Sequence, residues 1–213
     1  LHLKNKERQL VVYSFDHIAH TINLDGLYER DYLKIFFKWA ENNYPNIFKY
    51  TAVDIGANIG NHTLYFSDAF EKVIGYEAHP KTFKILKINT EDHSKISIHN
   101  IGISDKRGES FLIDSSSNMG GTRITDSRNN LKVKLDKLDN LIEKHLNIKL
   151  IKIDTEGHEA KVLRGAIKTI KENKPLILFE QQKNDYKEGK SEVVEILKKI
   201  GYNNFLIIEK SNF

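Results

Sequence analysis

The stretch Asp54-Ile-Gly-Ala-Asn-Ile-Gly60 decides how this chain is organised. It follows an apolar, strand-like run, Tyr50 to Val53, and leads into an amphipathic helical pattern, Asn61 to Phe70. A glycine-rich turn between strand and helix lets a ligand approach the backbone closely, because glycine has no Cβ and reaches positive φ freely. The stretch therefore predicts a cofactor-binding turn formed by Gly56, Asn58 and Gly60.

A second short apolar run, Val73 to Tyr76, predicts the next strand, and it ends in an acid, Glu77. An acid at this place can accept hydrogen bonds from the two hydroxyls of a ribose. The turn and Glu77 together indicate a pocket for an adenosine-containing cofactor.

The residue that leads the turn, Asp54, bears on which cofactor is bound. A dinucleotide fingerprint needs G-x-G-x-x-G, whereas this chain has Asn58 in place of a middle glycine, and asparagine tolerates the left-handed conformation. A carboxylate facing the turn repels a pyrophosphate and suits the amino and sulfonium groups of S-adenosylmethionine. We expect S-adenosylmethionine, with S-adenosylhomocysteine as the product. A nicotinamide-dependent oxidoreductase, a non-catalytic cofactor-binding module and a turn without a ligand remain alternatives.

Composition narrows the function classes. The 213 residues, 39% of them hydrophobic, can bury the core of one domain. The absence of cysteine excludes disulfides, thiolate metal sites and the cysteine nucleophile of pyrimidine-C5 methylation. The 33 basic and 29 acidic side chains are interspersed, so no nucleic-acid partner is expected. With neither a signal peptide nor an apolar run long enough for a membrane span, we expect a cytoplasmic protein. The composition indicates no oligomeric state.

From residue 49 onward, short β-branched runs alternate with helical patterns, which is typical of a mostly parallel sheet covered on both faces. We expect an α/β, Rossmann-like, doubly wound sheet in residues 49–213, with a short N-terminal helical cap in residues 1–48. The expected strands are Tyr50 to Ile55, Val73 to Tyr76, Ile96 to Ile101, Ile148 to Asp154, Leu176 to Glu180 and Asn204 to Ile208. The expected helices are Asp31 to Asn42, Asn61 to Phe70, Pro80 to Asp92, Glu159 to Glu172 and Ser191 to Ile200.

One part of the chain departs from this alternation. Ser110 to Ile113 and Leu131 to Leu135 are strand-like and are joined by a polar loop, Asp114 to Asn130. Long loops in compact domains often bind ligands, so this loop is a candidate lid.

In doubly wound sheets, ligands bind beyond the carboxyl ends of the strands. After the third strand, Ser104 and Asp105 could frame an adenine. The fourth strand ends in Asp154-Thr-Glu-Gly-His-Glu159, which we interpret as the reacting centre, and the fifth ends in Glu180. A carboxylate in a dry pocket or a histidine can accept the proton of an alcohol. The candidate catalytic residues are Asp154, Glu156, His158 and Glu180; the alternative for Thr155 and Glu156 is a capped helix start.

The basic residue on the fourth strand, Lys152, lies on the same strand face as Asp154 by period-two alternation. A buried lysine needs an anionic partner, so we expect an ion pair with a carboxylate. Asp154, Glu156, Glu159, Glu180 and a histidine could supply the oxygen-rich site that magnesium prefers. No spacing demands a metal, so a metal is possible but not expected. His62, at the start of the first helix, and His79, just after Glu77, could line the pocket, although such residues are more often ordinary surface or half-buried ones.

The motifs together resemble the FkbM-type methyltransferase family. They are Asp54 to Gly60, Tyr76-Glu77-Ala-His-Pro80, Val133 to Leu138, Ile151 to Glu159, Leu163-x-Gly165-Ala166 and Pro175 to Glu180. The resemblance runs from about Gly26 to Glu180 and implies a class I, S-adenosylmethionine-dependent O-methyltransferase. For the acceptor it implies a hydroxyl of a sugar, a glycan or a small natural product.

The resemblance also bears on the N-terminal segment and on the far edge of the sheet. Gly26-Leu-Tyr-Glu29 is similar to a motif that precedes the family's domain, which suggests that Tyr28 and Glu29 approach the methionine end of the cofactor. Ala78-His79 departs from the family's usual pair after the acid. The final antiparallel strand of the fold is expected to be missing or built elsewhere, because the sequence ends soon after Ile208.

Overall fold

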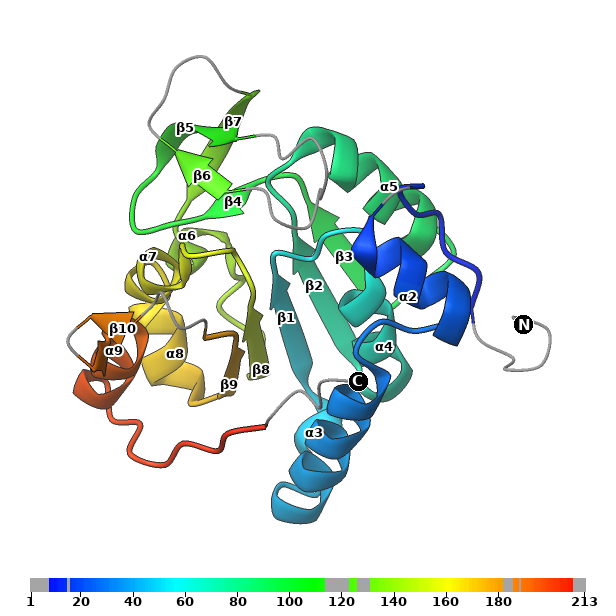
Figure 1. Cartoon of the computed structure of the whole chain (residues 1–213). Helices are drawn as coiled ribbons and strands as arrows, with labels where there is room; N and C mark the ends of the chain where they lie inside the picture. Colours follow the sequence, from blue (N-terminus) through cyan, green and yellow to red (C-terminus); the bar gives the residue numbers. More distant parts are fainter. Residues whose placement is uncertain are drawn as a thin grey trace.

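The computed structural model describes residues 8–14, 16–113, 123–125, 131–181, 186–187 and 189–208. Within them, a parallel sheet with the strand order β3-β2-β1-β8-β9 forms the centre of the molecule (Figure 1). Its strands are β1 (Thr51–Ile55), β2 (Lys72–Tyr76), β3 (Ile96–His99), β8 (Ile148–Ile153) and β9 (Leu176–Phe179). The chain winds outward from β1 first on one side and then, through β8, on the other. The predicted doubly wound, mostly parallel sheet is confirmed.

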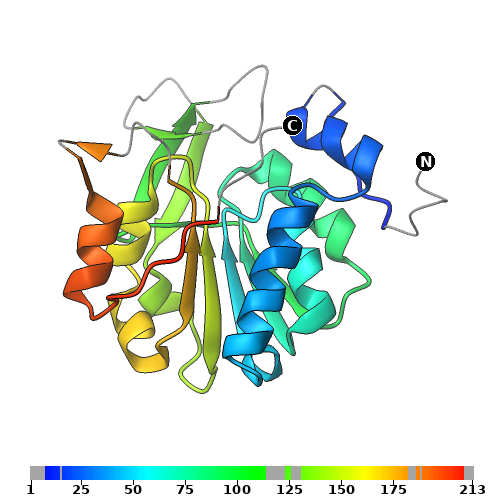
Figure 2. The same ribbon diagram turned by 60° about the horizontal axis from the view of Figure 1, so that its bottom comes forward.

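Helices cover both faces of this sheet, as Figure 2 shows. Alternation along β1 sends Ala52 to one apolar core and Val53 and Ile55 to the other. On the first face lie α3 (Arg30–Asn43), α4 (Asn61–Ala69) and α5 (Pro80–Thr90). On the second lie α6 (Leu138–Leu141), α7 (Glu159–Arg164), α8 (Ile167–Asn173) and α9 (Glu192–Lys199).

The N-terminal segment is helical, as predicted, but its helices lie in different parts of the fold. Helix α3 and the short η1 (Ile47–Lys49) pack on the first face of the sheet through Leu33, Phe36 and Ile47. Helix α2 (His17–Asp25) lies instead above the carboxyl ends of the strands (Figure 1). Only the first part of the segment is therefore a cap; α3 belongs to the helical layer.

Four strands between residues 102 and 136 form a second, smaller sheet with the order β4-β7-β5-β6. Its strands are β4 (Gly102–Ile103), β5 (Gly108–Ile113), β6 (Arg123–Thr125) and β7 (Leu131–Asp136). The two strands predicted here are confirmed and pair antiparallel, with Ser110 opposite Val133. Of the predicted lid, β6 is described, and the rest lies outside the described residues. A short hairpin, β10 (Tyr186–Lys187) with β11 (Lys190–Ser191), precedes α9.

Two predicted elements are wrong. The segment 204–208 is not a strand: Phe205, Leu206 and Ile207 are 41%, 58% and 84% exposed, and apolar character alone does not make a strand without a partner edge. The helix predicted from Glu159 to Glu172 is two helices separated at Gly165. A Cβ on Gly165 would lie 1.9 Å from the carbonyl oxygen of Ser104, so this close backbone approach bends the chain there.

Two further differences concern the sheet edges. Strand β3 ends at His99 rather than Ile101, because the next residues turn into β4 of the second sheet. No described segment pairs antiparallel with the central sheet.

None of the helices in the described part of the chain has both the length and the apolar character needed to cross a bilayer.

Candidate functional site

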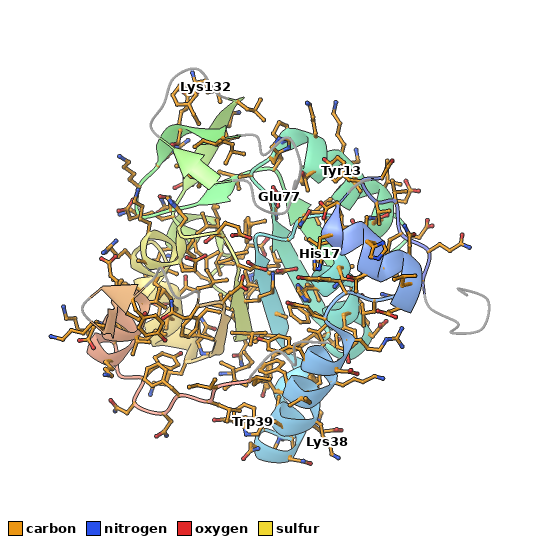
Figure 3. The ribbon with its side chains drawn as sticks, viewed as in Figure 1. Tyr13, His17, Lys38, Trp39, Glu77 and Lys132 are labelled. Atoms are coloured by element: carbon orange, nitrogen blue, oxygen red, sulfur yellow. The ribbon has the colours of Figure 1, made fainter. Side chains whose placement is uncertain are left out.

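A cavity of about 210 Å³ opens at the carboxyl ends of the central strands, where the order of the strands reverses. The turn after β1 lines it from Gly56 to Ile59, and the end of β2 lines it from Tyr76 to His79. Asp154, Thr155 and Glu156 line it from the end of β8. The N-terminal cap contributes His17 and Ile18 at the start of α2, together with Tyr28 and Glu29; Figure 3 labels His17.

The turn after β1 has the backbone that its sequence predicts. Gly56 has a φ of +81°, Asn58 +51° and Gly60 +97°. A Cβ on Gly56 would lie 1.8 Å from the carbonyl oxygen of Asp154, so this position requires glycine because β8 approaches it. Gly60 is not among the lining residues; a Cβ there would meet Leu86 of α5 at 2.8 Å. Gly56 and Asn58 therefore line the cavity, whereas Gly60 shapes the turn from behind.

Backbone N–H groups fix the acid after β2, Glu77, which Figure 3 labels. Its Oε2 accepts a hydrogen bond from the N–H of Asn58 at 2.9 Å, and its Oε1 accepts one from the N–H of His79 at 2.7 Å. Burial nevertheless raises the pKa of Glu77 to about 7, against these hydrogen bonds. Its carboxyl group thus faces the cavity in one orientation and titrates near neutral pH.

Asp54 differs from the expectation that it faces a ligand. Its side chain is fully buried and is not among those lining the cavity. Oδ2 accepts a hydrogen bond from the hydroxyl of Thr63 at 2.6 Å, and Oδ1 lies 3.3 Å from Nζ of Lys152. The predicted ion pair of Lys152 is confirmed, but it neutralises Asp54 beneath the turn, so the charge of Asp54 does not reach the cavity unopposed.

Lys152 also joins this buried charge to the cavity, because its Nζ lies 3.3 Å from Oδ2 of Asp154. Burial alone lowers the pKa of Lys152, but the carboxylates of Asp54 and Asp154 outweigh it and raise that pKa above its ordinary value. Burial alone raises the pKa of Asp154, but Lys152 and then His62 lower it below its ordinary value. Both groups are therefore charged at neutral pH.

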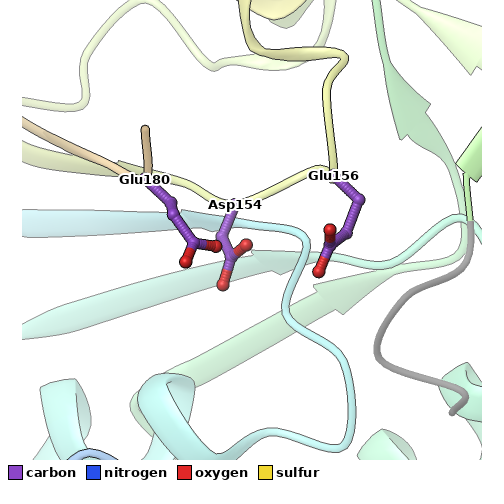
Figure 4. Close-up of side chains that lie close together, drawn as sticks. All are labelled: Asp154, Glu156 and Glu180. Carbon is purple, nitrogen blue, oxygen red and sulfur yellow. The ribbon is translucent and has the colours of Figure 1, made fainter. Parts of the chain in front are cut away.

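Three of the predicted catalytic acids do come together. One carboxylate oxygen each of Asp154, Glu156 and Glu180 lies within 4.8 Å of the other two, and Figure 4 shows the three groups pointing to the same side. This donor set could hold a divalent cation. Glu159 does not join it: its Oε1 accepts hydrogen bonds from the N–H and hydroxyl of Thr155 and from the N–H of Gly157.

The helix-start alternative for Thr155 and Glu156 is wrong, because α7 begins only at Glu159. Glu156 has a φ of +53°, a left-handed conformation that turns the chain before the helix. His158, Ser104 and Asp105 are not among the residues that line the cavity. Nε2 of His158 lies 3.0 Å from Oγ of Ser104, both buried, so this pair fastens α7 to the second sheet. Ile101, Gly102 and Ile103 line the cavity instead.

A contact between the cap and α4 adds to the site and could not be expected from the sequence. His62, in the first turn of α4, lines the cavity, and its Nε2 lies 3.1 Å from Oε2 of Glu29. Their side chains are 9% and 12% exposed. A pair of hydrogen bonds fastens the cap turn to α4: Asn61 Oδ1 accepts from the N–H of Tyr28, and Asn61 Nδ2 donates to its carbonyl oxygen. The signal in the sequence was Asn61-His62 directly after the turn, but no spacing connects it to Glu29.

Backbone strain gathers at the same place. In the part of the chain that the structure describes, the non-glycine residues with positive φ are Glu29, Asn58, Glu156 and Lys174. All but Lys174 line the cavity. Residues in sparsely populated backbone regions often mark functional sites.

The fold and this site define a class I methyltransferase: a doubly wound sheet whose first turn and second-strand acid border one cavity at the switch in strand order. The chain belongs to the FkbM methyltransferase family, since the family model described as "Methyltransferase FkbM domain" matches residues 54–207. The family expected from the sequence motifs is confirmed.

One curated relative is "Hexuronic acid methyltransferase AglP" of Haloferax volcanii, 28% identical over 160 residues. The match covers 74% of this chain and 63% of that relative, so the chain spans less than two thirds of it. Among solved structures, methyltransferase FkbM from Methylobacillus flagellatus is 21% identical with a TM-score of 0.44, covering 62% of this chain and 32% of that one. Precorrin-6y C5,15-methyltransferase from Geobacter metallireducens is 10% identical with a TM-score of 0.42, covering 73% and 64%.

Proposed function

We propose that the chain is an S-adenosylmethionine-dependent O-methyltransferase acting on a hydroxyl of a sugar, a glycan or a small natural product. The observation that carries this proposal is the setting of Glu77. Its two oxygens are oriented by the N–H groups of Asn58 and His79 beside the turn that follows β1. A ribose seated on that turn would donate its hydroxyl hydrogens to this carboxylate.

The charge around the cavity supports a cationic donor rather than a diphosphate. Among the described residues, Glu29, Glu77, Asp154, Glu156 and Glu180 line it against one lysine, Lys152, so acids outnumber lysines there. Their summed field attracts the sulfonium and ammonium groups of S-adenosylmethionine and repels a dinucleotide's pyrophosphate. The preference that the sequence analysis assigned to Asp54 is thus better assigned to these five acids.

The residues take roles according to their places. Gly56, Asn58 and Glu77 hold the nucleoside part of the donor, while Ile101 and Gly102 border the adenine. Glu29 and Asp154 border the methionine end, and Glu156 and Glu180 face the acceptor. S-adenosylmethionine supplies an activated methyl group, so the chain's own residues need only align the acceptor oxygen and receive its proton.

A sugar-bearing acceptor is the preferred substrate class. The curated relative is named as a hexuronic acid methyltransferase, which supports this choice. The cavity's polar rim of carboxylates also suits a ligand rich in hydroxyl donors.

Calorimetric titration tests the proposal. S-adenosylhomocysteine is expected to bind the wild-type protein, and NAD is not. Glu77→Ala is expected to abolish binding, whereas Glu109→Ala, which removes an exposed acid paired with Lys132, is expected to leave it unchanged. Binding of NAD in preference to S-adenosylhomocysteine would refute the assignment.

A further inference from the structure

We infer that the methyl group goes to a hydroxyl whose proton is taken by His62, with Glu29 as its positioning residue, so that the product is an ether and not a methyl ester. This inference rests on the proposed function and names the acceptor chemistry of the same site.

The two nitrogens of the His62 ring have different surroundings. Nε2 is shielded from solvent and lies 3.1 Å from Oε2 of Glu29. The two atoms do not have the alignment of a hydrogen bond, so the Glu29 carboxylate acts on the ring through its charge. Nδ1 is not shielded in this way and has no hydrogen-bond partner among the described residues. A carboxylate beside Nε2 keeps the proton of a neutral imidazole on that atom, which leaves the Nδ1 lone pair for a ligand in the cavity.

The position of the pair is fixed from both sides. His62 is held by α4, and Glu29 is held at a φ of +59° while the Asn61 side chain bonds Tyr28 next to it. His62 lines the same cavity as Asp154 and Glu156 at the end of β8 and Glu180 at the end of β9. An acceptor between them would have its reacting oxygen beside His62.

The methyl transfer conserves atoms and electrons. The acceptor oxygen forms a bond to the methyl carbon, the bond from that carbon to sulfur breaks, and its electron pair stays on sulfur to give neutral S-adenosylhomocysteine. The hydroxyl proton passes to Nδ1 of His62, and Glu29 stabilises the resulting imidazolium. Solvent takes the proton after the products leave.

A carboxylate acceptor would need no general base, because it has already lost its proton at neutral pH. It would also meet the carboxylates of Asp154, Glu156 and Glu180, whose oxygens lie within 4.8 Å of one another. Like charges at such distances repel strongly where solvent is scarce. A base on one side and three acids on the other therefore favour a neutral hydroxyl.

The chemistry of the product is the first test. The protein is incubated with methyl-labelled S-adenosylmethionine and either p-nitrophenyl β-D-glucoside or p-nitrophenyl β-D-glucuronide. The two glycosides differ only at C6, which is a hydroxymethyl group in the glucoside and a carboxylate in the glucuronide. Label that survives mild alkali is an ether and supports the inference. Label released by mild alkali, found on the glucuronide alone, is a methyl ester and overturns it.

The second test needs no turnover. Nitrogen-15 spectra of the histidine rings are recorded with S-adenosylhomocysteine bound, and the His62 signal is assigned by its loss in His62→Gln. A neutral ring protonated on Nε2 is expected, and Glu29→Gln is expected to change that signal while Glu109→Gln does not. A ring protonated on Nδ1 would overturn the inference. Failure of S-adenosylhomocysteine to bind the wild type would refute the proposed function instead.

Kinetics separate a base from a structural residue. On the glycoside that accepts label, His62→Gln is expected to lower kcat by about 100-fold or more, the usual effect of losing a general base. The KM for the glycoside and the affinity for S-adenosylhomocysteine should change little. An unchanged kcat in His62→Gln would contradict the assignment.

Discussion

Asp54 and Lys152 are register partners on the adjacent parallel strands β1 and β8, and Nζ of Lys152 lies 3.3 Å from Oδ1 of Asp54. Directly paired residues of neighbouring strands project to the same face, so the sheet itself holds the two charges together. The pair lies beneath the turn that follows β1 and leads on to Asp154 at the cavity. Asp54, the most buried charge in the motif, therefore stabilises the site from beneath the turn.

Removal of Lys152 is expected to destabilise the protein strongly. Lys152→Met leaves the fully buried Asp54 without its cation, and breaking a buried pair in this way costs about 3–5 kcal/mol of unfolding free energy. Urea denaturation followed by circular dichroism measures it. Lys132→Met removes one partner of an exposed pair with Glu109 and should cost about 0–1 kcal/mol. Equal losses in both variants would contradict the buried-pair argument.

The affinity for S-adenosylhomocysteine is expected to depend on pH through Glu77. The pKa of this carboxyl is about 7 without ligand, and ribose hydroxyls donating to it would favour the charged form. Binding then releases a proton, so affinity should rise with pH up to about 7 and level off above it. Titration calorimetry in buffers of different ionisation enthalpy measures the released proton. Glu77→Gln should remove the release; its persistence would assign the proton to another group.

Gly56 is expected to tolerate no side chain. In Gly56→Ala the new Cβ would lie 1.8 Å from the carbonyl oxygen of Asp154 at a φ of +81°, so the turn and the end of β8 must separate. We expect lost S-adenosylhomocysteine binding and a lower melting temperature. Gly108→Ala is the matched control, since no atom lies within 4 Å of a Cβ there. Retained binding in Gly56→Ala would show that the close approach does not shape the site.

Glu156 is expected to matter for turnover more than for the donor. It lies beside Asp154 and Glu180 and faces the acceptor side of the cavity, so Glu156→Gln should bind S-adenosylhomocysteine normally and transfer methyl groups more slowly. Binding and single-turnover rates measured on one preparation separate the two effects. A variant that loses donor binding would move Glu156 to the cofactor side.

Chelation is expected to leave S-adenosylhomocysteine binding unchanged, because Glu77 and the turn after β1 hold it without a metal. Turnover should also survive, since His62 supplies the base and the sulfonium supplies the electrophile. Protein treated with EDTA and desalted is compared with protein supplied with magnesium. Activity restored only by magnesium would mean that the three acids bind a cation after all.

Local patterns were sufficient to predict the first half of the site. A strand, a glycine turn, a helix and a second strand ending in Glu77 are contiguous, so their geometry follows from short-range rules. An ion pair of Lys152 with a carboxylate also followed from its place on a buried strand, although the sequence did not identify Asp54, 98 positions earlier, as a partner. Such rules do not give the burial of a side chain, so they could not show that Asp54 lies beneath the turn.

Contacts between distant segments could not be predicted. The approach of Glu29 to His62 depends on how the cap folds over α4, and no periodicity records it. His158 was assigned to catalysis because of its neighbours in the chain, yet α7 directs it to Ser104. The apolar run at Phe205 to Ile207 has strand propensity, but a strand also requires a partner edge.

The left-handed backbone at Glu29, Asn58 and Glu156 has a consequence for engineering. Asparagine tolerates this conformation, but at each glutamate it costs of the order of 1–3 kcal/mol, so glycine in place of Glu29 or Glu156 should make the protein more heat-resistant. The same exchanges would delete two carboxylates from the cavity. Selection for thermostability alone should therefore favour inactive variants at these two positions.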